Sequence, residues 1–183
     1  MVCMPPGSAT STYTSAIFPA WFLGRNPAKS VIAASHTQEL AERFGRRVRN
    51  IVAAREYGNV FGVGVAEDSA AAGRWDTDKG GEYYAAGVGG SITGRRADLA
   101  IIDDPVKSRE DADSERGREK AWDWYTNDLL TRLKPGARQI VVMTRWHEDD
   151  LGGRILERER ERWHVIEIPM EAMDDDPLGR KPG

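Results

Sequence analysis

Four short apolar runs, separated by segments with helical spacing, limit the folds that this chain can adopt. The runs cover residues 30–35, 99–102, 139–143 and 163–168. Apolar strands that alternate with helices are typical of an α/β domain in which helices flank a mainly parallel sheet. In such a sheet, ligands bind at the carboxyl ends of the strands. We therefore expect the functional residues to follow these runs directly.

The segments between the runs predict helices. Apolar residues at helical spacing predict one helix after residues 30–35, extending to about Val52, and a second amphipathic helix over 108–133. A charged helix is expected over 148–162, and residues 13–22 are compatible with another. We interpret residues 61–94 as short strands and loops. The apolar residues before the first loop, 2–4, are too few to predict a strand.

Composition narrows the function. The 183 residues fit one domain, the single cysteine is typical of a reducing compartment, and no apolar run is long enough to cross a membrane. A net charge of −3 argues against a protein that coats nucleic acid, so any DNA contact should be local and transient. The densest basic cluster is predicted to be the solvated face of a helix; it comprises Arg43, Arg46, Arg47 and Arg49.

A turn of small residues precedes the helix-compatible run at 13–22. Such a turn lets backbone N–H groups cradle phosphate oxygens at the start of a helix. The candidate nucleotide-binding residues are Pro6, Gly7, Ser8, Ala9, Thr10, Ser11 and Thr12. Compared with the phosphate loop G-x-x-x-x-G-K-[ST], Ser11 matches the magnesium-binding hydroxyl, whereas Thr10 stands where the lysine is expected. A structural turn before a helix is the alternative interpretation of this segment alone.

Acidic and hydroxyl side chains follow two of the apolar runs. Asp103 suits a carboxylate that holds magnesium, and the adjacent Asp104 suits a group that orients an attacking water. Thr144, at the end of another run, is a candidate sensor of the γ-phosphate, with Arg145 beside it. An Asp-Asp-Pro sequence is also a common turn, so this pair alone decides nothing.

The order of several motifs resembles that of the large terminase subunits of tailed phages and prophages. The motifs are Pro5–Ala9, Ala33–Thr37, Gly94–Asp98, Ile101–Arg109 and Thr144–Leu151, and they extend over nearly the whole chain. The resemblance implies a P-loop ATPase of the additional-strand type, with the phosphate loop at residues 5–12. It implies that Asp103 binds magnesium, that Asp104 is the catalytic acidic residue, and that Thr144 and Arg145 form the coupling motif.

The same resemblance implies the partners and the domain plan. It implies that the protein uses ATP and Mg²⁺ as cofactors. The implied partners are double-stranded DNA, the portal protein and the small terminase subunit. A ring of copies on the portal, in the cytoplasm of a bacterial host, is expected. We expect residues 1–172 to be an N-terminally truncated ATPase domain, without the adenine-contacting segment. Residues 173–183 would then be a polar linker toward an RNase H-like nuclease domain that is missing here.

The residue at position 10 divides the functional hypotheses. Thr10 cannot supply the fixed positive charge that phosphoryl transfer requires, and no Lys or Arg occurs between residues 1 and 22. We expect an ATP-driven DNA-packaging motor module with impaired turnover. The alternative is a catalytically inactive terminase remnant that binds nucleotide weakly or serves only in assembly. A helicase of the same superfamily would need a second motor domain, which we do not find.

Two adjacent arginines precede the Asp103 run. Arg95 or Arg96 could reach the γ-phosphate of a neighbouring subunit as an arginine finger, an arrangement that contributes several orders of magnitude to phosphoryl transfer. A solvated pair in a loop is the alternative, because adjacent like charges prefer water.

Overall fold

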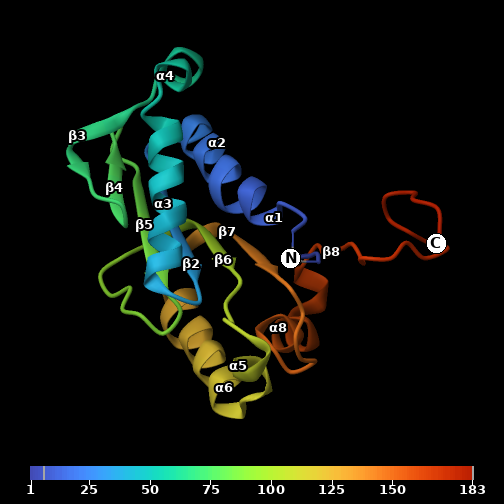
Figure 1. Ribbon diagram of the computed structural model, residues 1–183. Helices are drawn as coiled ribbons and strands as arrows, with labels where there is room; N and C mark the ends of the chain where they lie inside the picture. Colours follow the sequence, from blue (N-terminus) through green and yellow to red (C-terminus); the bar gives the residue numbers. More distant parts are fainter. Residues whose placement is uncertain (6, 183) are drawn as a thin grey trace.

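One mixed sheet runs through the chain in the computed structural model, which describes residues 1–5 and 7–182 (Figure 1). Within the described residues the eight strands lie in the order β3-β4-β5-β2-β6-β7-β1-β8. Their bounds are β1 Val2–Cys3, β2 Ser30–Ser35, β3 Val65–Ala70, β4 Arg74–Thr77, β5 Glu82–Gly87, β6 Ala97–Asp103, β7 Leu133–Met143 and β8 Ile166–Glu167. The strands from β5 to β8 in this order are parallel, and β3 and β4 are antiparallel. The predicted α/β class is therefore confirmed.

The position of β7 identifies the type of sheet. It lies between β1, which leads into the phosphate-loop segment, and β6, which ends on Asp103. Val142 pairs with Val2 on one side and with Asp103 on the other. A strand inserted between these two is what defines the additional-strand type of P-loop fold. The expectation that residues 2–4 form no strand was wrong, because pairing with both β7 and β8 makes two residues sufficient for β1.

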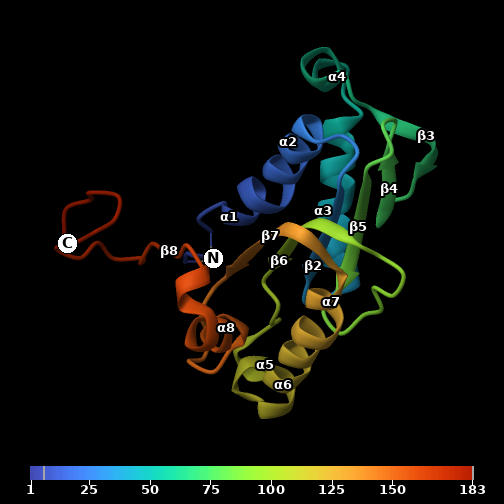
Figure 2. The same cartoon turned by 180° about the vertical axis from the view of Figure 1, so that it is seen from behind.

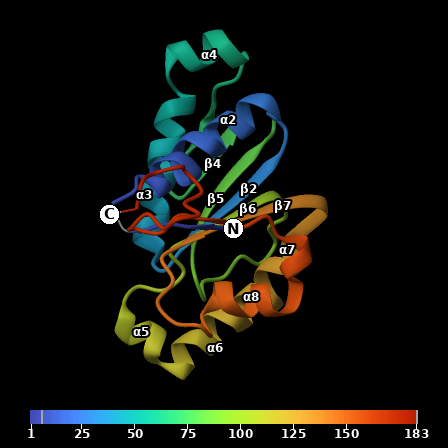
Figure 3. The same cartoon turned by 90° about the vertical axis from the view of Figure 1, so that its right-hand side faces the viewer.

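Helices cover both faces of the sheet. Their bounds are α1 Thr10–Thr12, η1 Tyr13–Ile17, α2 Phe18–Arg25, α3 Gln38–Val52, α4 Arg55–Phe61, α5 Arg109–Asp113, α6 Glu115–Asp123, η2 Trp124–Leu129, α7 Leu130–Arg132, α8 Leu151–Glu159 and η3 Arg160–Arg162. Figure 3 shows α2, α3 and α4 on one side of the strands and α5, α6 and α8 on the other. Two hydrophobic clusters fill the two interfaces between these layers.

Burial on both faces explains why the strands are continuous apolar runs. Along β2, Val31 and Ala33 belong to the cluster under α3, whereas Ile32 and Ala34 belong to the cluster on the opposite face. All four side chains are at most 4% exposed. A strand buried on both sides has no polar alternation, as the sequence of residues 30–35 indicates.

The helix predictions hold with changes at the ends. Thr37 caps α3, its hydroxyl accepting the N–H of Leu40, and the expected 108–133 helix is divided into four segments. Ser114, the cap of α6, produces the first break. The last helical segment ends at Arg132, one residue before the predicted end, because strand β7 begins at Leu133. Strand β8 covers only two residues of the predicted run 163–168.

The segment after β8 extends away from the sheet (Figures 1 and 2). It contains no helix or strand over the described residues 168–182. Asp176 orders part of it, because its carboxylate binds the Arg180 guanidinium and the N–H groups of Leu178 and Arg180. None of the helices in the described part of the chain has the length and hydropathy of a transmembrane span.

Candidate functional site

A strand, a tight loop and a helix follow one another at the start of the chain. After β1, Gly7 has φ +84° and Ala9 has φ +57°, both in the left-handed region. The carbonyl of Ala9 accepts the N–H groups of Thr12 and Tyr13, which begins the helix. The predicted loop residue Pro6 lies outside the described residues. The described part of the loop borders a cavity of about 270 Å³, lined by residues 4, 5, 7–12, 104 and 142–144.

Thr10 faces the interior of the loop without adding a charge. Its hydroxyl donates to the sulfur of Met4 at 3.1 Å. None of the described residues that line the cavity is a lysine or an arginine. An anion in this cavity would therefore meet backbone N–H groups and hydroxyls, but no fixed cation among these lining residues.

Asp103 joins the loop helix to the central sheet. The hydroxyl of Ser11 donates to Oδ1 of Asp103 at 3.0 Å, and the hydroxyl of Ser15 donates to Oδ2 at 2.5 Å. Asp103 is only 2% exposed. The pKa of Asp103 is raised to about 6, chiefly by burial and also by the neighbouring Asp104 carboxylate, against the opposing effect of the two serine donors. This carboxylate is desolvated and has hydroxyl donors as its hydrogen-bond partners.

Asp104 adopts a backbone conformation that is uncommon for residues other than glycine. Its φ is +46°, and its carbonyl accepts the N–H of His36 at 3.1 Å while the His36 ring Nδ1 lies equally close. The N–H of Thr144 donates to its Oδ1 at 3.3 Å. Burial raises the pKa of Asp104, against the opposing effect of the Thr144 N–H. The strained turn places this side chain at the cavity.

The segment after β7 has one end at the cavity and the other at α8. Thr144 lines the cavity, and its hydroxyl lies 3.4 Å from the Met4 carbonyl that it faces. Arg145 is not among the described lining residues. Its Nε donates to Asp150 Oδ2 at 2.9 Å, and its guanidinium also reaches the carbonyl of Glu148. Asp150 is buried and caps α8 through the Gly153 N–H. The proposed catalytic role of Arg145 stays a prediction.

An ion-pair network holds the same segment to α6. The Asp149 carboxylate accepts hydrogen bonds from Nε and Nη2 of Arg154, at 2.7 and 2.8 Å, and from Nε of Arg118 at 3.0 Å. Arg154 also contacts Glu119 on α6 at 2.8 Å. These guanidinium groups hold the pKa of Asp149 far below its usual range.

Arg95 and Arg96 lie away from the cavity. Both precede Ala97, the first residue of β6, whereas Asp103 is the last, so the two arginines are at the opposite end of that strand. Arg95 forms an ion pair with Glu82 and lies 4.7 Å from the ring centroid of Tyr84. Arg96 is exposed, with one long contact of 3.5 Å to the Leu133 carbonyl. Within one chain they are not part of the site.

The structure adds two residues that the sequence did not single out. Ser15 is one helical turn after Ser11, a spacing that could have indicated a second hydroxyl on the same helix face. His36 directly follows β2, at the same sheet edge as Asp103 and Asp104.

Comparisons with known proteins identify the family of the chain and support its fold. Residues 2–183 match the family described as "Terminase large subunit, T4likevirus-type, N-terminal". The fold is similar to the crystal structure of the HK97 bacteriophage large terminase, with a TM-score of 0.59 and 15% sequence identity. That match covers 98% of this chain and 36% of the HK97 chain, so this chain spans about a third of that protein's length. No curated protein sequence matches the chain.

Proposed function

Because this chain belongs to the large-terminase N-terminal family of phage DNA-packaging proteins, we propose that it is the ATPase module of a packaging motor. In this proposal, hydrolysis of Mg²⁺-bound ATP drives double-stranded DNA into the capsid. The observation that carries the proposal is the bond between Ser11 and Asp103, two residues 92 positions apart. It unites the hydroxyl at the start of the loop helix with the carboxylate at the end of β6, the pair that P-loop enzymes use for magnesium.

The residues at the cavity fit the phosphates of ATP and the Mg²⁺ ion that the proposal requires. Backbone N–H groups of the loop, over residues 7–12, would bind the phosphates at the start of the helix. The Ser11 hydroxyl and the Asp103 carboxylate are hard oxygen ligands, which Mg²⁺ prefers. Bound Mg²⁺ would neutralise charge on the phosphates. Ser15 would hold Asp103 in position from its other oxygen.

Asp104 and Thr144 have the proposed catalytic roles. Asp104 lines the cavity beside the loop, where its carboxylate would orient the attacking water. The Thr144 N–H holds Oδ1 of that carboxylate, and the Thr144 hydroxyl lies at the same cavity to sense the terminal phosphate. A change at Thr144 would pass directly to Arg145 and the Asp150 cap of α8, which we propose as the route toward mechanical coupling.

The absence of a cation at position 10 predicts weak activity. Removing one donor that stabilises charge in a transition state costs about 3 to 4 kcal/mol in well-studied enzymes. We expect Thr10→Lys to raise ATP turnover at least tenfold, measured as phosphate release with Mg²⁺ present. Thr131→Lys is the matched control, because it makes the same residue change at an exposed position on α7 that does not line the cavity.

The two variants separate the possible results. A gain for Thr10→Lys, with Thr131→Lys remaining at the parent rate, supports a phosphate site of the proposed geometry. Equal rates for parent and Thr10→Lys would instead favour the inactive remnant, which would bind nucleotide weakly or act only in assembly. That second function is favoured by a specific observation, since no lining residue of the described cavity carries a positive charge.

Assembly would complete the motor. We propose a homo-oligomeric ring on the portal protein, with the small terminase subunit and DNA as further partners. In a ring, an arginine at the amino end of β6 could act on a neighbour's phosphate. Of the two candidates, Arg96 is the more available, because Arg95 is already bound to Glu82 and stacked on Tyr84.

A further inference from the structure

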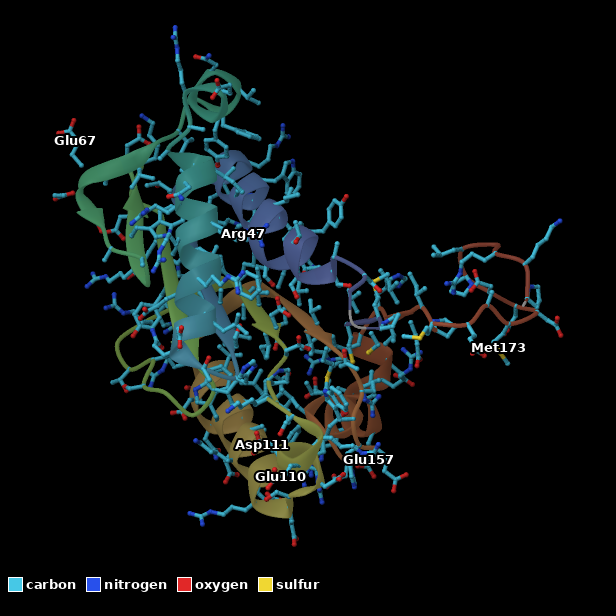
Figure 4. All side chains as sticks on the ribbon, viewed as in Figure 1. Arg47, Glu67, Glu110, Asp111, Glu157 and Met173 are labelled. Atoms are coloured by element: carbon cyan, nitrogen blue, oxygen red, sulfur yellow. The ribbon has the colours of Figure 1, made fainter. Side chains whose placement is uncertain are left out.

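The outer face of α3 carries three arginines in a single helical turn. Arg43, Arg46 and Arg47 are exposed. The buried residues of α3 lie on the opposite face: Ala41, Gly45, Val48 and Val52. Successive residues in a helix turn by about 100°, so the three arginines form one stripe directed away from the sheet. Figure 4 places Arg47 about halfway along α3.

The orientation of this stripe is fixed by the packing underneath. The Trp75 indole N–H donates to the Gly45 carbonyl at 3.2 Å, and a side chain at Gly45 would approach the Ala72 carbonyl to 2.6 Å. The helix therefore lies directly against the sheet, with little room to rotate. Both Trp75 and Tyr83, which stacks on it at 5.2 Å, are fully buried.

The three arginines lack internal counter-charges. Across the described residues, none of them has a carboxylate within 4 Å, whereas Arg118 and Arg154 on the other face of the sheet are neutralised by Asp149. Glu39 and Glu42 on the same helix are four residues before Arg43 and Arg46, but in the described part of the chain neither forms an ion pair with these arginines. An exposed stripe of unneutralised guanidinium groups favours an external polyanion.

We infer that this stripe of α3 is a contact surface for the phosphate backbone of duplex DNA. The inference rests on the proposed function, because a packaging motor must hold its duplex at some surface. One helical turn spans about 5.4 Å, and duplex DNA carries one negative charge per about 1.7 Å of its axis, so the three guanidinium groups can reach adjacent phosphates. Backbone contacts carry no sequence information directly, which suits a motor that moves along DNA of any sequence. The net charge of −3 is expected to keep the binding weak, and the phosphate contacts make it salt-dependent.

The test compares the salt dependence of DNA binding between charge-matched variants. Affinity of the chain for a labelled 30-base-pair duplex of mixed sequence is measured by fluorescence anisotropy over a range of NaCl concentrations, without nucleotide. One variant is Arg43→Ala, Arg46→Ala and Arg47→Ala together. The control, Arg116→Ala, Arg138→Ala and Lys181→Ala, removes the same charge from three exposed positions outside α3. Circular dichroism checks that both variants fold.

Each phosphate contact contributes about 0.9 to the slope of log K against log salt. The α3 variant should therefore lower the slope by up to about 2.7, and the control by less than about 0.5. Equal slopes for the two variants, or no measurable binding by the parent at low salt, would overturn the assignment. Because no nucleotide is present, neither result depends on Thr10, and the ATPase proposal is decided separately by its turnover assay.

Discussion

Two aspartates at the same edge of the sheet differ in burial and in hydrogen-bond partners. Asp103 is 2% exposed, and its hydrogen-bond partners are the hydroxyls of Ser11 and Ser15. Asp149 is more exposed and has two guanidinium partners, Arg118 and Arg154. The pKa of Asp103 is raised to about 6, mainly by burial, whereas hydrogen bonds from Arg154 hold the pKa of Asp149 well below its usual range.

The difference shows which carboxylate is suited to bind a cation. Asp149 already has its counter-charges, so its network is complete and has a structural role. Asp103 is desolvated without a cationic side chain bonded to it, and removing a carboxylate from water is unfavourable unless a positive charge compensates. We therefore propose that Asp103, a buried carboxylate with hydroxyl partners beside the loop, is a preformed ligand for a divalent ion.

The largest expected effect is the change of folding stability with pH that Asp103 causes. The folded-state pKa of Asp103, about 6, lies above its ordinary value of 3.8, so the folded protein binds this proton more tightly than the unfolded chain does. Its contribution to stability is present below about pH 4 and is lost as the pH rises through 6. At about 1.4 kcal/mol per pKa unit, the loss is about 3 kcal/mol at most.

Urea unfolding of the parent and of Asp103→Asn, from pH 4.5 to 7.5 without Mg²⁺, measures this loss. The advantage of the asparagine variant should grow with pH, since it remains neutral. Asp113→Asn, an exposed aspartate on α5, is the control and should show a difference that varies by less than about 0.5 kcal/mol. A pH-independent advantage for Asp103→Asn would remove the contrast with Asp149.

The second largest expected effect is the loss of folding stability when Asp149 is removed. Asp149→Ala leaves the Arg154 guanidinium, whose side chain is 10% exposed, with Glu119 as its remaining carboxylate. We expect a loss of about 2 kcal/mol in the free energy of unfolding at pH 7. Glu119→Ala, which removes a half-exposed partner, should cost about 0.5 kcal/mol. Equal losses for the two variants would show that Asp149 is not the centre of the network.

The smallest effect concerns Ser15. Ser15→Ala removes a buried hydrogen bond to Asp103 and should destabilise the protein by about 1 kcal/mol. Since this donor lowers the pKa of Asp103, the variant should also move the midpoint of the pH dependence upward. The urea series above measures both changes. An unchanged midpoint would mean that Ser15 does not influence the carboxylate.

The fold was largely predictable because its main strands are buried on both faces. Residues 30–35, 99–102 and 139–143 are apolar except at Ser30, Ser35 and Gln139, and each run was predicted as a strand. The strand that the sequence did not predict is short and depends on pairing within the folded sheet. Strand β1 has two residues and forms only because β7 and β8 flank it. No local pattern indicates such a strand.

The sequence predicted those residues of the candidate site that lie at the ends of strands. Asp103 ends β6, Asp104 and Thr144 directly follow β6 and β7, and the structure brings all three to the loop. The partners of these residues were less accessible to sequence reasoning. The bond of Arg145 to Asp150 depends on how the chain enters α8, and the His36 contact with the Asp104 carbonyl depends on the left-handed turn at Asp104. These contacts join segments whose relative placement only the folded sheet determines.

Calorimetric titration of Thr10→Lys with ATP, with and without Mg²⁺, tests the central claim most directly. The claim is that the loop and Asp103 form a magnesium and nucleotide site that lacks only the cation at position 10. We predict Mg²⁺-dependent binding to Thr10→Lys, weaker binding to the parent, and loss of the Mg²⁺ dependence when Asp103→Ala is added. Binding that is unaffected by Asp103→Ala, or no binding to Thr10→Lys at all, would contradict the account.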